Sequence, residues 1–275
     1  MARSTNTPRL GSSGAMPLTL VKYLVGSGAG SRRECAALII AGRVSVNGEA
    51  VTNLTQSIKA SDRVAIGDRG LTAGSGKALY LLVNKPIGYL STVRDDRGRR
   101  TVLDLVPQAL RVPGLVPAGR LDLRSSGLML LTNDGELVNR VTHPRYGVRK
   151  EYHILVDHLL GQGDARKLVS GVDLPEGRAR AVSVRRLADI GEPNRYSITM
   201  VEGKKREVRQ LLAAVGRRVT QLERVKLGNL DLGGLAKGKV RELTPRELSG
   251  LRSVSEPPQN SAQRAASGAR GRAAR

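Results

Sequence analysis

The chain has to build its interior from aliphatic side chains, because its 275 residues include no Phe, no Trp and only six Tyr. Leu, Val, Ile and Met must therefore fill the core, and their short periodic runs indicate where strands and helices lie. The shortage of aromatic rings also excludes a platform of repeated stacking side chains, which single-strand nucleic-acid binders use. Any stacking on a base has to come from a few Tyr or from Arg planes.

A large positive charge accompanies this composition. The chain carries 46 Lys and Arg against 24 Asp and Glu, which gives a formal net charge of +22. A charge of that size favours a polyanionic partner. The alternative is a basic surface that serves solubility alone, although solubility requires far less charge.

Metal and membrane sites have little support in the sequence. Cys35 is the single cysteine, which excludes an internal disulfide and a thiolate metal cage. The three histidines, His143, His153 and His158, do not form a ligand pattern. No apolar run approaches the ~18 residues that span a membrane. We therefore predict no metal site and no membrane contact.

Both ends of the chain have the composition of unfolded segments. Residues 1–16 are rich in Ser, Thr and Gly. They share some character with an organellar transit peptide, but they are short and weakly basic, so a disordered tail is the preferred interpretation. Residues 253–275 combine two prolines with many Ala, Ser, Gly and Arg. Such a segment cannot bury enough apolar area to fold alone, and we expect a disordered basic tail.

Residues 17–68 are predicted to form a small α/β module. Two short helices come first, and Ser31 is a plausible N-cap of the second, with Glu34 as its capping-box partner. The alternating segment that follows contains Asn47-Gly48, which is typical of a tight hairpin. The glycine-rich residues 69–77 are interpreted as a linker.

Strands and helices alternate irregularly over residues 78–252. The absence of a regular βαβ rhythm favours an α+β domain with a mixed, mostly antiparallel central sheet. Strands are expected at 78–84, 127–133, 151–157, 181–187, 196–202 and 219–230, and helices at 136–142, 205–215 and 244–251.

The segment GRLDLRSSGLMLLTNDG, residues 119–135, is the most informative for chemistry. Asp122 lies between two leucines, is flanked by Arg120 and Arg124, and leads into a core strand. A carboxylate fixed in a partly apolar loop near arginines suits a nucleophile or a base acting on a sugar or nucleobase. The structural alternative is a loop Asp that caps the backbone.

This segment resembles the catalytic loop of pseudouridine synthases of the RsuA/RluB type. Residues 30–35 and the GRVSVNG run resemble the small RNA-binding module that is named after a small-subunit ribosomal protein. Further blocks that resemble the family in the same order are NKPIGYLSTVRDDRGRRTVLDLVP (84–107), RKEYHILVD (149–157) and EGKKREVRQLLAAVGRRVTQLERVKLG (202–228).

The resemblance implies a pseudouridine synthase fold and an enzyme that isomerises a uridine in ribosomal RNA, with large-subunit RNA slightly favoured. It implies a cytoplasmic, monomeric protein that needs no metal and no organic cofactor. Asp122 would be the catalytic aspartate, and Tyr152 would pack on the uracil face. Arg209 would pair with Asp122, Leu212 would line the pocket floor, and Arg120 would contact the substrate.

A uridine in folded RNA has to be extruded before it reaches such a pocket, and phosphate contacts have to offset that cost. A catalytically silent ribosome-assembly protein on the same scaffold and a basic DNA-architectural protein are the alternatives. The predicted phosphate contacts are Arg32, Arg33 and Arg43 in the small module, and Arg94, Arg97, Arg99 and Arg100 in a loop beside the site.

Overall fold

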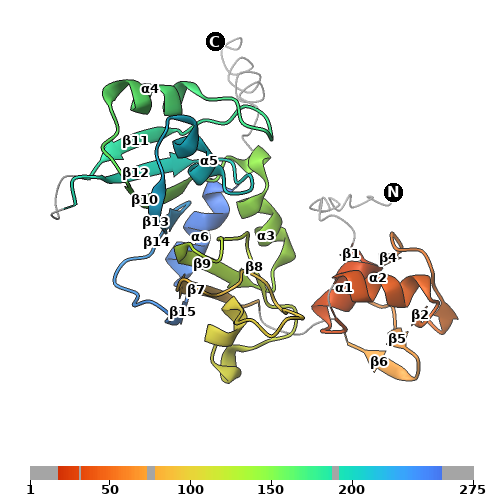
Figure 1. The fold of residues 1–275 in the computed structure, drawn as a ribbon. Coiled ribbons are helices and arrows are strands. Elements are labelled where there is room, and N and C mark those ends of the chain that lie inside the picture. Colours follow the sequence, from red (N-terminus) through yellow and green to blue (C-terminus); the bar gives the residue numbers. More distant parts are fainter. Residues whose placement is uncertain (1–17, 31, 73–77, 188–191, 256–275) are drawn as a thin grey trace, which may run out of the picture. The chain divides into compact units, whose positions relative to one another are not determined.

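The computed structural model describes residues 18–30, 32–72, 78–187 and 192–255. The chain divides into two compact units, residues 1–77 and residues 78–275 (Figure 1). The predicted N-terminal tail and Ser31 lie outside the described residues. At the other end, helix α6 continues to Val254, so the first two residues of the predicted C-terminal tail are helical.

The first unit packs two short helices over small sheets. Its core gathers Leu20, Leu24, Ile39, Val44 and Val64, all of them aliphatic as the composition requires. The expected order of helix, helix and sheet is found, preceded by one two-residue strand. The elements are β1 (Leu18–Thr19), α1 (Leu20–Gly26), α2 (Arg32–Ile40), β2 (Val44–Val46), β3 (Glu49–Ala50), β4 (Ser57–Ile58), β5 (Val64–Ile66) and β6 (Arg69–Leu71).

The predicted linker, residues 69–77, begins inside the first unit. Residues 69–71 form β6, which pairs antiparallel with β5, so that Val64 faces Leu71. Gly67 adopts a φ of +55° in the turn between them, a conformation that glycine takes without strain. A three-residue strand with a single large apolar side chain gives no readable alternation, which is why the sequence did not indicate it. Residues 73–77 lie outside the described part of the chain.

The second unit is built on one nine-stranded sheet with the order β11-β12-β10-β13-β9-β7-β15, to which β14 and β8 add short edges. Only the β9–β13 pair is parallel among the described strands. The predicted α+β class is confirmed. The strands are β7 (Tyr80–Lys85), β8 (Val116–Pro117), β9 (Ser126–Thr132), β10 (Lys150–Val156), β11 (Ser183–Arg186), β12 (Arg195–Met200), β13 (Val219–Leu227), β14 (Leu230–Asp231) and β15 (Val240–Glu242).

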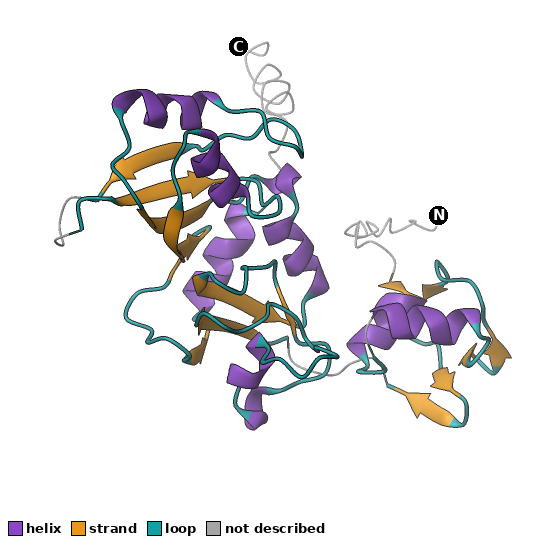
Figure 2. Cartoon of the chain, in the orientation of Figure 1, coloured by secondary structure: helices purple, strands orange, loops and turns teal. Residues whose placement is uncertain are grey.

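Helices cover both faces of this sheet (Figure 2). On β9, Leu128 and Leu130 point into the cluster that contains residues of α3 and α6, and Met129 and Leu131 point into the opposite cluster with residues of α4 and α5. The helices are α3 (Gly135–Thr142), α4 (Gln162–Ser170), α5 (Glu207–Ala214) and α6 (Pro245–Val254), with 3-10 turns at Val102–Leu105, Gln108–Leu110 and Pro144–Tyr146.

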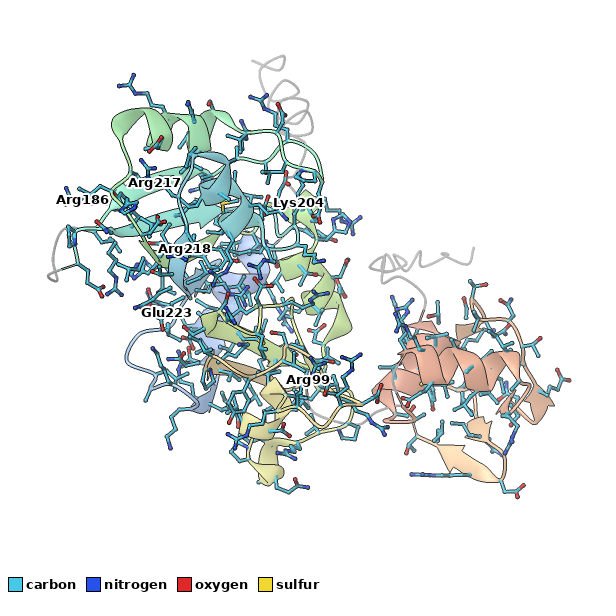
Figure 3. The ribbon with its side chains drawn as sticks, in the orientation of Figure 1. Arg99, Arg186, Lys204, Arg217, Arg218 and Glu223 are labelled. Atoms are coloured by element: carbon cyan, nitrogen blue, oxygen red, sulfur yellow. The ribbon has the colours of Figure 1, made fainter. Side chains whose placement is uncertain are left out.

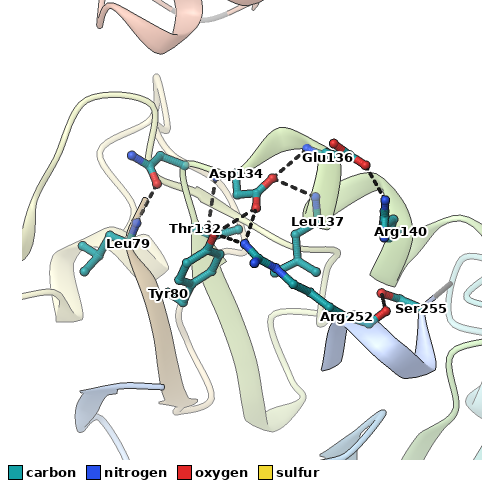
Figure 4. A network of polar contacts seen from close by, with 10 residues as sticks. Leu79, Tyr80, Thr132, Asp134, Glu136, Leu137, Arg140, Arg252 and Ser255 are labelled. Carbon is teal, nitrogen blue, oxygen red and sulfur yellow. Dashed lines mark hydrogen bonds and ion pairs between the residues drawn. The ribbon is translucent and has the colours of Figure 1, made fainter. Parts of the chain in front are cut away.

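A partly exposed polar network ties α3 and α6 to the sheet (Figure 4). Asp134 caps α3 by accepting from the backbone N–H groups of Glu136 (3.1 Å) and Leu137 (3.0 Å). Its other oxygen accepts from the Tyr80 hydroxyl at 2.9 Å, and Arg252 of α6 donates to the same hydroxyl at 2.8 Å. Asp134 is therefore a structural residue, because its oxygens are used in capping and in tying three elements together.

The parallel contact between β9 and β13 depends on a glycine. Gly127 has a φ of +106°, and a Cβ placed on it would lie 2.2 Å from the carbonyl oxygen of Arg224. No other residue type fits at that distance. The contact joins the beginning of β9, directly after the Asp122 loop, to the middle of β13.

Candidate active site

A cavity of about 310 Å³ opens in the second unit, and Asp122, Tyr152 and Arg120 all line it. Asp122 comes from the loop before β9, Tyr152 from β10, and other walls come from α5, β13 and the segment after β12. The structure thus brings together three of the five residues that the resemblance assigned to substrate. Asp122 is half-buried, Tyr152 is buried and Arg120 is exposed.

The backbone around Asp122 is held at every carbonyl from residue 121 to residue 125. A carboxylate on such a loop starts from a fixed position, which saves orientational freedom when substrate binds. The five hydrogen bonds run from Ser91 Oγ to the Leu121 oxygen (2.8 Å), from Ser125 N to Asp122 (3.0 Å), from Gly88 N to Leu123 (2.8 Å), from Arg209 Nη2 to Arg124 (3.2 Å), and from Lys85 Nζ to Ser125 (2.7 Å).

Lys85 holds the Asp122 loop through the Ser125 carbonyl, a contact that the sequence interpretation missed. Its side chain is fully buried at the end of β7, and Nζ also donates to the Pro86 carbonyl at 2.9 Å. Burial lowers the pKa of Lys85 to about 8, and the negative charge of Asp122 opposes that shift. The available signal was a lysine at the end of a strand, YLLVNK, that is largely apolar.

Arg209 supports the loop in a way that differs from the prediction. Within the described ranges no ion pair within 4.0 Å joins Arg209 to Asp122. The guanidinium instead donates to two backbone carbonyls, those of Val219 (2.7 Å) and Arg124 (3.2 Å). Burial lowers the pKa of Arg209, and Asp122 acts in the opposite direction, so the carboxylate is within electrostatic reach. The side chain therefore holds the loop by its backbone, at the Arg124 carbonyl.

Leu212 does not line the cavity, contrary to expectation. It is fully buried in the hydrophobic core beside Leu211. Val208, which precedes it by one helical turn on the same face of α5, lines the cavity instead. Val208 and Leu212 lie on one helix face, and of the two only Val208 lines the cavity.

Three further buried charged side chains line the cavity and were not predicted: Lys150, Glu207 and Arg224. Lys150 lies two residues before Tyr152 on the buried face of β10, and Arg224 is the cross-strand partner of Tyr152 on β13. Burial is the main cause that lowers the pKa of Lys150 to about 8, and burial also raises the pKa of Glu207. Strand alternation was the available signal, because charged residues at buried positions of a strand are rare.

The arginines proposed to bind phosphates are all exposed, on both units. Arg99 (Figure 3) donates to the carboxylate of Asp95 at 2.7 Å, and this side-chain bond is the main cause that lowers the pKa of Asp95 to about 2. Arg100 lies over the ring of Tyr89, 5.9 Å from its centroid. Part of the loop charge is therefore already engaged within the loop, and RNA binding by these residues stays a prediction.

Across the described residues there is no group of three or more His, Cys, Asp or Glu that could hold a metal ion. In the same part of the chain, none of the helices has the length and apolar character needed to cross a membrane.

Known proteins resemble this chain in both units. Residues 79–214 match the family model of the RNA pseudouridylate synthases, and residues 18–64 match that of the S4 domain. The ribosomal large subunit pseudouridine synthase B of Bacillus subtilis is 37% identical over 243 residues, which cover 86% of this chain and 96% of the relative. The protein of that name from Salmonella typhimurium is 37% identical over 251 residues, which cover 89% of this chain and 86% of the relative. A crystal structure of a pseudouridylate synthase superposes with a TM-score of 0.61 at 27% identity, covering 85% of this chain and 99% of that one.

Proposed function

This chain belongs to the family of RNA pseudouridylate synthases, and on that premise we propose that it converts a uridine of ribosomal RNA to pseudouridine with Asp122 as the catalytic carboxylate. Large-subunit RNA is the proposed substrate, because two relatives of high coverage are named for it. The observation that carries the proposal is the single cavity that holds both Asp122 and Tyr152.

The size of the cavity suits one nucleotide. Small-molecule pockets range over ~300–1,000 Å³, and this one has about 310 Å³. A duplex does not fit, so the uridine has to leave its stack, which costs a few kcal/mol. The exposed arginines of both units are proposed to offset that cost by binding phosphates.

The reaction breaks the N1–C1′ bond of uridine, turns the uracil, and forms a C5–C1′ bond, while C5 loses a proton and N1 gains one. Positive charge develops at C1′ when the first bond breaks, and a carboxylate held beside the ribose stabilises it. The backbone bonds to residues 121–125 hold Asp122 in place for that role. Tyr152 supplies an aromatic face against which the uracil packs while it is detached.

The test compares Asp122→Asn with the wild type on ribosomal RNA from cells that lack the gene. Pseudouridine is detected by chemical tagging and primer extension. We expect RNA binding to survive and product formation to fall by more than about a thousandfold. The exposed Asp173→Asn serves as the matched control and should retain activity. A wild type without product on any ribosomal RNA would favour the silent assembly factor, and an active Asp122→Asn would remove the carboxylate from the mechanism.

The proposal also places the enzyme in the cytoplasm as a monomer. Light scattering after size-exclusion chromatography tests the oligomeric state, and a mass near 29.4 kDa is expected.

A further inference from the structure

Lys150, Glu207 and Arg224 form an unusual group within the cavity. They are only 8%, 5% and 2% exposed, and all three line the space that Asp122 and Tyr152 share. Buried charges are normally paired, because an isolated one is strongly penalised. Within the described ranges no two of these three form an ion pair within 4.0 Å. Their charges nevertheless lie close, since both Arg224 and Glu207 affect the pKa of Lys150.

Each of the three is anchored by a hydrogen bond, and Arg224 and Glu207 each keep a second buried atom without a partner. Arg224 Nε donates to the carbonyl of Leu128 at 2.7 Å, and its buried Nη2 has no partner. Glu207 accepts from the backbone N–H of Lys204 (Figure 3) at 3.2 Å through Oε2, and its buried Oε1 has no partner.

Lys150 Nζ donates to the carbonyl of Val201 at 2.7 Å, with a longer contact of 3.4 Å to that of Glu202. An ammonium carries three hydrogens, so it keeps donor capacity beyond these bonds. The group therefore offers two donors and one acceptor to whatever enters the cavity.

The sheet places these groups beside the proposed base-stacking ring. Arg224 is the cross-strand partner of Tyr152, and Lys150 is two residues from Tyr152 on the same buried face. Side chains of directly opposed residues are neighbours, with Cβ atoms ~4.5–5.5 Å apart. A base that packs on Tyr152 presents its edge to this wall of the cavity.

We propose that Arg224, Glu207 and Lys150 read the Watson–Crick edge of the extruded uracil, with Glu207 accepting from N3–H and the two cations donating to O2 and O4. The inference rests on the proposed function for its ligand. Uracil offers two acceptors and one donor on this edge, which matches the group. Cytosine presents a bare N3 and an amino group, so the carboxylate faces a lone pair and one cation faces a donor. A site built for one hydrogen-bond pattern rejects the other because its buried groups stay unpaired.

A phosphate is the competing ligand for two buried cations. Glu207 argues against it, because a carboxylate with an open oxygen in the same cluster repels an anion. The two readings differ in one measurable respect: a base edge distinguishes uracil from cytosine, and a phosphate does not.

The test measures binding of uridine and cytidine 5′-monophosphates to the full chain by saturation-transfer NMR. The two nucleotides carry equal charge, so the basic surface attracts both equally. That attraction cancels in the ratio of their affinities, which then reports on the cavity. We expect the Asp122→Asn parent to prefer the uridine nucleotide by about tenfold or more, and Glu207→Gln on that parent to narrow the preference below about threefold. The glutamine amide can turn its N–H₂ toward the cytosine N3.

Glu223→Gln is the matched control. Glu223 (Figure 3) adjoins Arg224 on β13, and strand alternation turns its side chain to the other face of the sheet. The control should keep the full preference. Lys150→Met provides a second variant in case Glu207→Gln fails to fold, and it should weaken uridine nucleotide binding more than cytidine nucleotide binding.

This experiment measures binding and needs no turnover, so it tests edge reading separately from pseudouridine formation. If the wild type makes no pseudouridine but Glu207→Gln abolishes a clear uridine preference, the proposed function fails and edge reading stands. An unchanged preference in both Glu207→Gln and Lys150→Met overturns edge reading. A parent without preference, or an equal loss of both nucleotides in the variants, overturns it as well.

Discussion

Two walls of one cavity differ in how their charged groups are held. Around Asp122, every carbonyl of residues 121–125 already accepts a hydrogen bond. On the wall formed by Lys150, Glu207 and Arg224, two charged side chains each keep a buried polar atom without a partner, whereas on the Asp122 side the Ser125 hydroxyl and Arg209 Nε do so. The first arrangement fixes a reactive group before substrate arrives. The second leaves donors and acceptors that a ligand can satisfy. We therefore assign positioning of the carboxylate to the first wall and recognition of the base to the second.

Gly127→Ala should break both walls at once and have the largest effect. Its Cβ would lie 2.2 Å from the backbone oxygen of Arg224, at a positive φ. Strain and strand separation should lower the free energy of unfolding by roughly 3–5 kcal/mol, as measured by urea denaturation. Gly135→Ala is the control, because no atom lies within 4 Å of its Cβ and its φ is not positive. A stability loss below about 1 kcal/mol would contradict the tight contact.

Arg209→Lys should loosen only the Asp122 wall. Arg209 joins Arg124 and Val219 through two separate nitrogens of a planar fork, and a lysine has a shorter side chain that ends in a single nitrogen, so it cannot reproduce that geometry. We expect single-turnover pseudouridine formation to fall about a hundredfold with little change in RNA affinity, because a misplaced group slows chemistry more than binding. The uridine over cytidine preference should stay unchanged. Were that preference lost too, the two walls would not be independent.

Lys85 and Lys150 should make stability depend on pH. Burial lowers the pKa of both to about 8 in the folded state, against 10.5 without it. Between those values the unfolded chain binds more protons, so the free energy of unfolding rises with pH by up to about 1.4 kcal/mol per unit for each lysine. Lys85→Met and Lys150→Met should each remove part of that rise in urea titrations from pH 8 to 10.5. A flat wild-type profile would contradict the buried charges.

Arg120→Gln should have the smallest effect, since Arg120 is exposed and lies at the cavity outside both walls. If it contacts a phosphate, the slope of log affinity against log salt should flatten by roughly 0.7–0.9. Filter binding at several salt concentrations measures this slope. Arg186→Gln (Figure 3) offers an exposed comparison on β11, where the slope should be unaltered.

The sequence predicted the α+β sheet and the Asp122 loop because both depend on local patterns. Strand runs such as GLMLLTN show their apolar character directly, and the GRLD segment lies next to one of them. The contacts of Arg209 did not follow from such a pattern. A guanidinium has several donors, and only the folded chain shows that two backbone carbonyls lie closer to it than the carboxylate.

Lys150, Glu207 and Arg224 were missed for a related reason. Each is a charged residue in a chain rich in charge, and charge alone does not distinguish a buried position from an exposed one. Their burial arises from strands β10 and β13 and helix α5, which are distant in sequence. Leu212, in contrast, was expected at the cavity and does not line it. Periodicity predicts the face of a helix but not how far a cavity extends along that face.

Strand β13 lies between β10 and β9, so it is the seam between two half-sheets. Tyr152 belongs to one half and the Asp122 loop leads into the other, although both precede β13 in the chain. In the order of the chain, both halves of the cavity therefore precede the strand that joins them. A chain cut before residue 219 would contain both Asp122 and Tyr152 but would lack the β13 residues, Leu222, Arg224 and Leu227, that complete the cavity.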